Sequence, residues 1–200
     1  MLRNSSFIDK FVRTWYPEST KTSGRTVFCL QQGRREVGGA RVFQVGDKVV
    51  YPMHGAGVIE AIEEREVLGD RKRYYVMRLP VSEMKVMVPC ESQREAGLRQ
   101  VMSEQALQSV LDVLSARITL MSKNWNHRYR ANMEKIKSGN ILELAEVVRN
   151  LSHRDRERGL STGERKMLEN ARQILLSEII LAKNFGPDQA NSFLDHVLVQ

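Results

Sequence analysis

The spacing of apolar residues changes abruptly partway along this chain, and that change limits the folds available to it. Between residues 45 and 89, apolar side chains tend to fall at every second position, which is the repeat of a β-strand with one buried face. From residue 101 onward they recur at intervals of three and four, which is the repeat of an amphipathic helix. The sequence therefore predicts an α+β chain, with strands first and helices second.

Turn-forming residues interrupt the first region several times, most clearly at residues 52–57 and 68–70. Gly55 and Gly57 are expected to supply the turn dihedrals of the first of these loops. The four or five short strands that remain are typical of a small curled antiparallel barrel of SH3 or Tudor type. We expect them at residues 45–51, 58–62, 73–79 and 84–88.

The second region predicts an all-helical bundle. Ser161 stands three residues before Glu164, which matches the capping-box pattern and indicates the start of a long helix. Asn140 with Glu143 indicates another helix start. We expect helices at residues 101–118, 124–137, 140–151, 164–184 and 189–199, with residues 154–158 as a solvated, internally paired connector.

Residues 1–42 show no sustained periodicity and carry 8 Lys/Arg against 3 Asp/Glu. We interpret them as a mostly disordered basic tail, with a short helix near residues 8–16. The expected organisation is therefore this tail, a barrel domain at residues 43–95 and a helical domain at residues 99–199.

The net charge of +7 is spread unevenly along the chain. Residues 43–120 carry 10 Lys/Arg against 11 Asp/Glu, whereas residues 121–172 carry 12 against 7. This local excess favours a polyanionic partner for residues 121–172, although a solvated basic face has the same composition.

Several classes of protein are disfavoured by what the chain lacks. No apolar stretch approaches the roughly 18 residues of a membrane span, the N-terminus lacks the apolar core of a secretion signal, and the two cysteines are far apart. A cytoplasmic protein is therefore expected. The common nucleotide-binding, zinc-protease and serine-hydrolase motifs are missing, and the histidines have no second ligand at metal spacing. We expect no catalysis, metal or cofactor, and the loop that contains His54 is the only support for an enzymatic alternative.

The most informative local segment surrounds Trp125, one of two tryptophans. An aromatic ring among basic and amide side chains, near a helix start, is typical of proteins that bind the DNA minor groove or single strands. Two interpretations stay open: the indole packs onto the bundle beside Tyr129, or it stands exposed for DNA. Arg165 and Lys166 lie in the first turn of a helix, where the dipole disfavours cations, which suggests an anion from outside.

Five segments of the chain occur in an order that is more specific than any single motif. They are residues 43–52, His54-Gly55, Asn124-Trp125 with Arg128-Tyr129, Glu157-Arg158-Gly159-Leu160-Ser161 and Ala171-Arg172-Gln173-Ile174-Leu175. Together they resemble the CarD/CdnL family of bacterial RNA polymerase-binding transcription regulators. The resemblance extends from about residue 42 to about residue 183 and does not include residues 1–41.

The resemblance implies a monomeric, non-enzymatic initiation factor that is associated with the nucleoid through RNA polymerase. Its Tudor-like domain would bind the polymerase β subunit, and its helical domain would contact the promoter minor groove with weak sequence specificity. A tryptophan wedge at the upstream edge of the bubble would stabilise the open complex. The implied DNA contacts are Trp125, Asn126, His127, Arg128, Arg130, Arg165 and Lys166. The implied polymerase contacts are Arg65, Met87 and Pro89.

Two departures and two alternatives accompany this resemblance. Met87 and His127 stand where relatives carry basic residues. Family members begin near the equivalent of Phe43, so residues 1–42 are either a tail or an extension upstream of a true start codon near Val42. The alternative function is a polymerase-tethered adaptor whose helical domain binds another protein rather than DNA.

Overall fold

The computed structural model describes residues 36–37, 40–67, 70–81 and 83–199. The expected helix at residues 8–16 and most of the expected tail lie outside the described residues. Two short strands within the expected tail, β1 (Glu36–Val37) and β2 (Ala40–Arg41), pair antiparallel with each other. The last residues of that region therefore form a short ladder.

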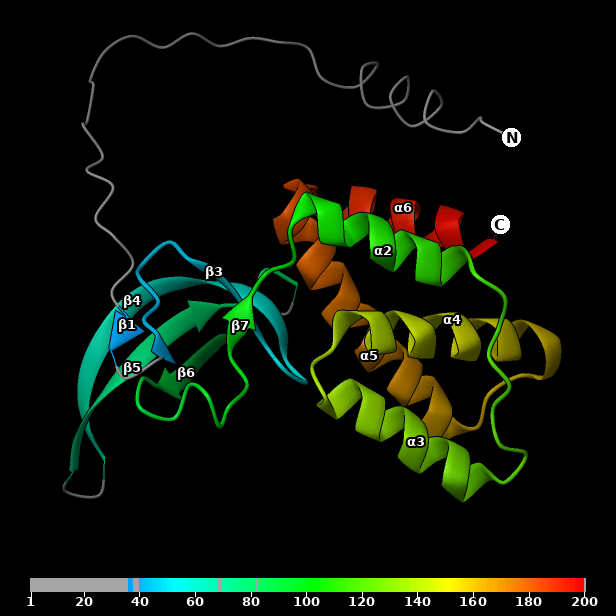
Figure 1. Ribbon diagram of the computed structural model, residues 1–200, viewed down its shortest axis with the longest axis horizontal. Coiled ribbons are helices and arrows are strands. Elements are labelled where there is room, and N and C mark those ends of the chain that lie inside the picture. Colours follow the sequence, from blue (N-terminus) through cyan, green and yellow to red (C-terminus); the bar gives the residue numbers. More distant parts are fainter. Residues whose placement is uncertain (1–35, 38–39, 68–69, 82, 200) are drawn as a thin grey trace, which may run out of the picture. The chain divides into compact units, whose positions relative to one another are not determined.

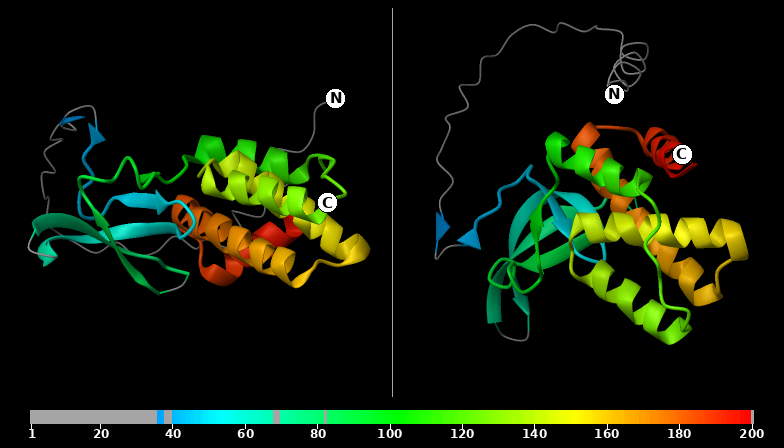
Figure 2. Two further views of the ribbon diagram at one scale, coloured as in Figure 1. Left: turned by 90° about the horizontal axis from the view of Figure 1, so that it is seen from below. Right: turned by 45° about the vertical axis from the view of Figure 1, so that its right-hand side comes forward.

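Five strands form one antiparallel sheet in the order β6-β5-β4-β3-β7, as the alternation of apolar residues predicts. Strands β4 and β5 make a long hairpin that curves and extends beyond the other strands (Figures 1 and 2). Strand β4 has 13 residues and begins at Gly55, so it is longer than expected and the loop before it is shorter. The bounds are β3 (Lys48–Tyr51), β4 (Gly55–Val67), β5 (Asp70–Arg78), β6 (Lys85–Pro89) and β7 (Arg99–Gln100).

The sheet has its own small apolar core, because alternate side chains of neighbouring strands point to the same face. The buried members are Phe43, Val49, Ile59, Tyr75, Met77, Leu79 and Val88. The rings of Phe43 and Tyr75 meet edge to face at 6.0 Å, and the Phe43 N–H donates to the Tyr75 hydroxyl at 3.3 Å. Phe43, the first residue of the expected barrel domain, therefore belongs to the core of the sheet.

Two glycines at the start of β4 have different roles. Gly55 has a φ of +100°, and a Cβ built there would lie 2.6 Å from the Ser177 hydroxyl oxygen. Gly57 has no left-handed φ, and a Cβ there would lie 2.5 Å from the carbonyl oxygen of Arg78. The expected turn role is therefore confirmed for Gly55 and wrong for Gly57, which is needed for the close approach of two strands.

Five helices follow within the described residues: α2 (Glu104–Ser115), α3 (Trp125–Lys137), α4 (Ile141–Arg158), α5 (Thr162–Lys183) and α6 (Pro187–Val199). Asn124 and Asn140 cap α3 and α4, and Ser161 forms the predicted capping box with Glu164 at the start of α5. The apolar faces of these helices share one core that includes Leu107, Val110, Leu144, Val148, Leu151, Leu175 and Leu194.

Two expectations about the helices are wrong. Helix α2 begins at Glu104 rather than near residue 101, because the Val101 N–H donates to the Lys48 carbonyl at 3.2 Å and continues the pairing of β7 with β3. Residues 154–158 are not a connector but the end of α4, which stops where Gly159 takes a φ of +74°. Their alternating charges are those of a solvated helix end.

The C-terminal half of α5 packs on the sheet. The Ser177 hydroxyl accepts a hydrogen bond from the Ala56 N–H at 2.7 Å and donates to the Ile174 carbonyl at 2.7 Å. Near the end of the same helix, the Lys48 ammonium donates to the Leu181 carbonyl at 2.7 Å. These contacts hold α5 against β3 and β4. In Figure 1, the helix lies at the ends of these strands.

Candidate nucleic-acid interface

Trp125 is the first residue of α3, and its side chain is 43% exposed. The side-chain oxygen of Asn124 accepts hydrogen bonds from the N–H groups of Asn126 and His127 at 2.9 and 3.3 Å, which fixes the helix start. The indole stacks on the Tyr129 ring, with centroids 5.1 Å apart and planes 27° apart. The two sequence interpretations are therefore both partly right: the ring is supported from one side and open on the other.

The support comes from the start of α5. The Trp125 Nε1–H donates to the Ser161 hydroxyl oxygen at 3.0 Å, across 36 residues of sequence. Gly163 lies beside the two stacked rings, and a Cβ built there would be 3.5 Å from the Trp125 ring and 3.7 Å from the Tyr129 ring. The N-termini of α3 and α5 thus meet at the indole.

Arg128 does not take the place that the sequence predicted for it. Only 4% of its side chain is exposed, and its Nε–H donates to Glu164 Oε1 at 2.6 Å. Its Nη1 donates to the backbone carbonyls of Ser122 and Lys123 at 2.8 and 3.3 Å. A guanidinium enclosed by these partners has almost no surface left for DNA, which argues against the phosphate contact expected of Arg128.

Glu164 is the acidic member of this buried pair, and 2% of its side chain is exposed. Burial raises the pKa of its carboxyl, but hydrogen bonds from Arg128 and from Ser161 lower it more, so the pKa lies below its ordinary value. Glu164 therefore stays ionised at neutral pH. The pair joins α3 to the start of α5, and Glu164 bonds to the same Ser161 hydroxyl that holds the indole.

The other residues predicted to contact DNA are on the surface. The side chains of Asn126, His127, Arg130, Arg165 and Lys166 are all exposed. Arg165 lies 3.9 Å from the carboxylate of Asp155, a distance at which an exposed pair contributes little. These five side chains stand on the first two turns of the two helices whose N-termini meet at Trp125.

Two cations near the indole were not predicted. Lys123 is exposed in the turn before α3, and the basic run around Trp125 already contained the signal for it. Arg154 lies with its Nε 3.9 Å from Glu164 Oε1, although it belongs to α4. No pattern in the sequence places Arg154 there, because the end of α4 approaches α5 only in the folded bundle.

The three residues predicted to contact polymerase lie on β4 and β6. Arg65 is exposed on β4 and donates two hydrogen bonds to Glu63 at 2.9 and 2.7 Å. Met87 is 44% exposed on β6, and Pro89 ends that strand. Within the described sheet, β6 pairs only with β5, so its other edge is unpaired. The strand register places all three residues on one face of the sheet.

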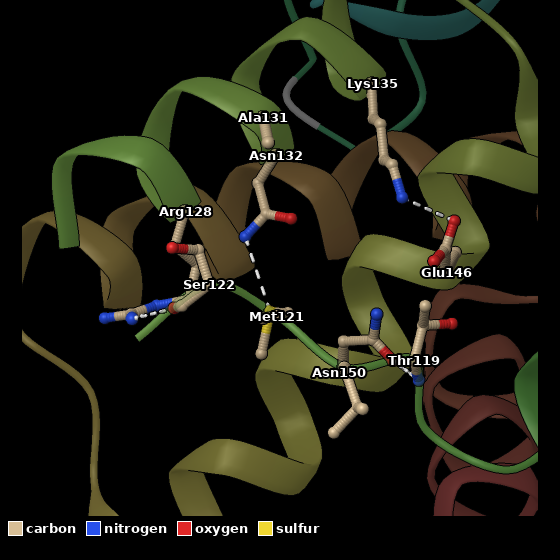
Figure 3. A pocket seen from close by; sticks show the side chains of 10 residues that line it. Thr119, Met121, Ser122, Arg128, Ala131, Asn132, Lys135, Glu146 and Asn150 are labelled. Atoms are coloured by element: carbon tan, nitrogen blue, oxygen red, sulfur yellow. Dashed lines mark hydrogen bonds and ion pairs between the residues drawn. The ribbon is translucent and has the colours of Figure 1, made fainter. Parts of the chain in front are cut away.

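A small cavity of about 120 Å³ lies between residues 119–122 and helices α3 and α4 (Figure 3). Its polar side chains already have partners: Lys135 donates to Glu146 at 2.6 Å, and the Asn150 side-chain oxygen accepts from the Thr119 backbone N–H at 3.1 Å. Ligand pockets usually have about 300–1,000 Å³, so this cavity has room for little more than water.

The described residues contain no group of three His, Cys, Asp or Glu side chains placed to hold a metal ion. None of the helices in that part of the chain combines the length and the hydropathy needed to cross a membrane.

Comparison with known proteins agrees with the division into a sheet and a helical bundle. Residues 43–102 match the family model described as the CarD-like/TRCF RID domain, and residues 109–195 match the model described as the CarD C-terminal domain. These matches define a two-part class in which an RID-type sheet precedes a CarD-type helical bundle.

A match to one whole relative points to the same family. The chain is 42% identical over 152 residues to the putative transcription factor YdeB of Bacillus subtilis (strain 168), a match that covers 76% of this chain and 99% of that protein. The chain belongs to the CarD-like family of transcription factors, as the resemblance of the sequence predicted. This is a family of transcription regulators rather than of enzymes.

Proposed function

We propose that this chain binds the RNA polymerase β subunit through its sheet and stabilises the promoter open complex with Trp125. The observation that carries the proposal is a half-exposed indole, held where two helix N-termini meet and flanked by exposed cations. Helix N-termini and basic side chains attract phosphates, and an apolar ring can enter the base stack of the minor groove. The factor acts as a monomer and needs no base-specific contact.

The physical mechanism is a shift in population between closed and open promoter complexes. A ligand stabilises one state only by the difference between its affinities for the two states. Inserting a ring costs a few kcal/mol of unstacking, and this cost is smallest where the strands already separate. An aromatic contact of roughly 1–3 kcal/mol at the upstream fork therefore lengthens the life of the open complex about tenfold or more.

Polymerase binding is assigned to the side of the sheet that carries Arg65, Met87 and Pro89. The outer edge of β6 has no partner in the described sheet, and an unpaired edge can add a strand from another protein. Met87 offers an apolar contact on this edge, and Arg65 offers a charge that is held in place by Glu63.

Helix α5 supports separate roles for the sheet and the indole, because it contacts both of them. Ser177 bonds to the sheet at Ala56, and Ser161 bonds to the indole. At about 1.5 Å of rise per residue, the helix between these serines spans about 24 Å. A continuous helix of this kind keeps the indole at a set distance from a polymerase bound to the sheet.

The test is the lifetime of the open complex with Trp125→Ala. We expect the variant to stay folded and to bind polymerase normally, because its ring is half exposed, and to shorten the lifetime about tenfold. Leu142→Ala is a matched control, since Leu142 is 39% exposed on α4 away from the site and should leave the lifetime unchanged. A folded Trp125→Ala protein with the wild-type lifetime would exclude the wedge.

One observation favours the alternative of a polymerase-tethered adaptor. Leu120 is 96% exposed and Ile118 is 44% exposed in the segment between α2 and α3. Exposed apolar side chains that lie close together can mark a protein-binding surface. A footprint on promoter DNA upstream of the bubble, present with this protein and lost with Trp125→Ala, supports the wedge. If Leu120→Ser abolishes the effect of the protein on transcription while the footprint stays unchanged, the adaptor is supported.

A further inference from the structure

The hydroxyl of Ser161 uses all of its hydrogen-bonding capacity. It accepts from the Trp125 Nε1–H at 3.0 Å and from the Glu164 backbone N–H at 3.3 Å, and it donates to Glu164 Oε2 at 2.9 Å. A hydroxyl has one hydrogen and two lone pairs, so these three bonds exhaust it. The oxygen that caps α5 is therefore the same oxygen that holds the indole.

The indole is also restrained on one face and at one edge. Tyr129 stacks on it at 5.1 Å, and Gly163 lies close to its edge because it has no side chain. Beneath Ser161, the Glu164 carboxylate is fixed by Arg128 at 2.6 Å. The ring direction is thus set by a chain of bonds from α3 to α5 and back to α3, while 43% of the side chain stays exposed.

We infer that Ser161 is a positioning residue that holds the Trp125 ring in its DNA-binding orientation before DNA arrives. This inference rests on the proposed wedge function and adds the source of its rigidity. A side chain that is already ordered loses less conformational entropy on binding than a mobile one. Removing the hydroxyl should therefore free the ring and shorten the open-complex lifetime about two- to tenfold.

The chemistry at residue 161 limits what can replace serine. Threonine keeps the donor and both acceptor sites, so Ser161→Thr should keep the ring fixed. Aspartate can cap the helix and accept from the indole, but its carboxylate cannot donate to Glu164 and would repel it. Glycine is tolerated at a helix N-cap almost as well as serine, yet it offers nothing to the indole.

Ser161→Gly therefore separates the two roles of the hydroxyl, and Ser103→Gly is its matched control. Ser103 caps α2 in the same way, by accepting from the Ala106 N–H at 3.2 Å, and has no indole on it. Full-length chains carrying Trp15→Phe leave Trp125 as the single tryptophan. The measurements are fluorescence anisotropy decay of that indole, thermal unfolding, and open-complex lifetime with polymerase and promoter DNA.

We expect faster ring motion and a shorter lifetime for Ser161→Gly, with both restored in Ser161→Thr and neither changed in Ser103→Gly. If Ser161→Gly leaves the ring motion unchanged, or if Ser103→Gly shortens the lifetime equally, the positioning role is refuted. Failure of the wedge itself is recognised separately, because Trp125→Ala would then have the wild-type lifetime even if the ring moves faster in Ser161→Gly.

Discussion

The guanidinium of Arg99 in β7 donates two hydrogen bonds to the carboxylate of Glu178 in α5, at 2.7 and 2.9 Å. The Glu178 side chain has no exposed surface, and its Oε1 also accepts from the Met102 N–H at 2.9 Å. The Arg99 Nε–H donates to the Gly139 carbonyl at 3.1 Å. One ion pair therefore joins the sheet, the entry to α2, the turn between α3 and α4, and α5.

The two members of this pair should not be equally costly to replace. Arg99→Met leaves a fully buried carboxylate without its partner, which should lower the free energy of unfolding by about 3–5 kcal/mol. Glu178→Gln should cost less, about 1–3 kcal/mol, because Arg99 is 32% exposed and water can solvate it. Urea denaturation measures both values, and a larger loss for Glu178→Gln would contradict this account.

Arg128 should behave as a structural residue. Arg128→Met removes the partner of buried Glu164 and should lower the free energy of unfolding by about 3–5 kcal/mol. Arg130→Met, an exposed arginine on the same helix, should change it by no more than about 0.5 kcal/mol. Chemical denaturation of the two variants tests the difference. Equal stability of both would mean that Arg128 is not held as described.

Arg165 and Lys166 should affect DNA binding and stability differently. Each phosphate contact that is lost should lower the slope of log affinity against log salt by about 0.9. Changing either residue to Gln removes a cation from the first turn of α5, so stability should stay the same or rise slightly. Salt titrations of promoter binding measure the slope. Lys137→Gln, at the other end of α3, is the control that should leave it unchanged.

Gly55 should be intolerant of any side chain. Gly55→Ala meets both the left-handed φ of +100° and the Ser177 hydroxyl, which would be 2.6 Å from the new Cβ. Gly46→Ala meets a similar φ of +93° with no atom within 4 Å, so it measures the backbone strain alone. We expect Gly46→Ala to cost about 1–3 kcal/mol and Gly55→Ala to cost more, in thermal or urea unfolding. A smaller loss for Gly55→Ala would show that α5 moves away without penalty.

Much of the secondary structure could be predicted because its signals are local. The helix start at Asn140 is predictable because a capping side chain bonds to backbone N–H groups two or three residues away. The capping box of Ser161 with Glu164 was predicted for the same reason. The start of α2 was misplaced because Val101 bonds to Lys48, more than fifty residues earlier in the chain.

The sequence by itself determined the order of strands and helices, the family, and the residue types gathered around Trp125. It did not determine which of those residues face outward. Arg128 and Arg130 are the same residue type, two positions apart on one helix, yet the first is buried and the second exposed. The partner that buries Arg128 is Glu164, 36 residues away, which reaches it only when α5 packs against α3. Tertiary packing alone decides which arginine is buried in an ion pair and which is exposed to solvent, because the desolvation of a charge depends on what surrounds it in space.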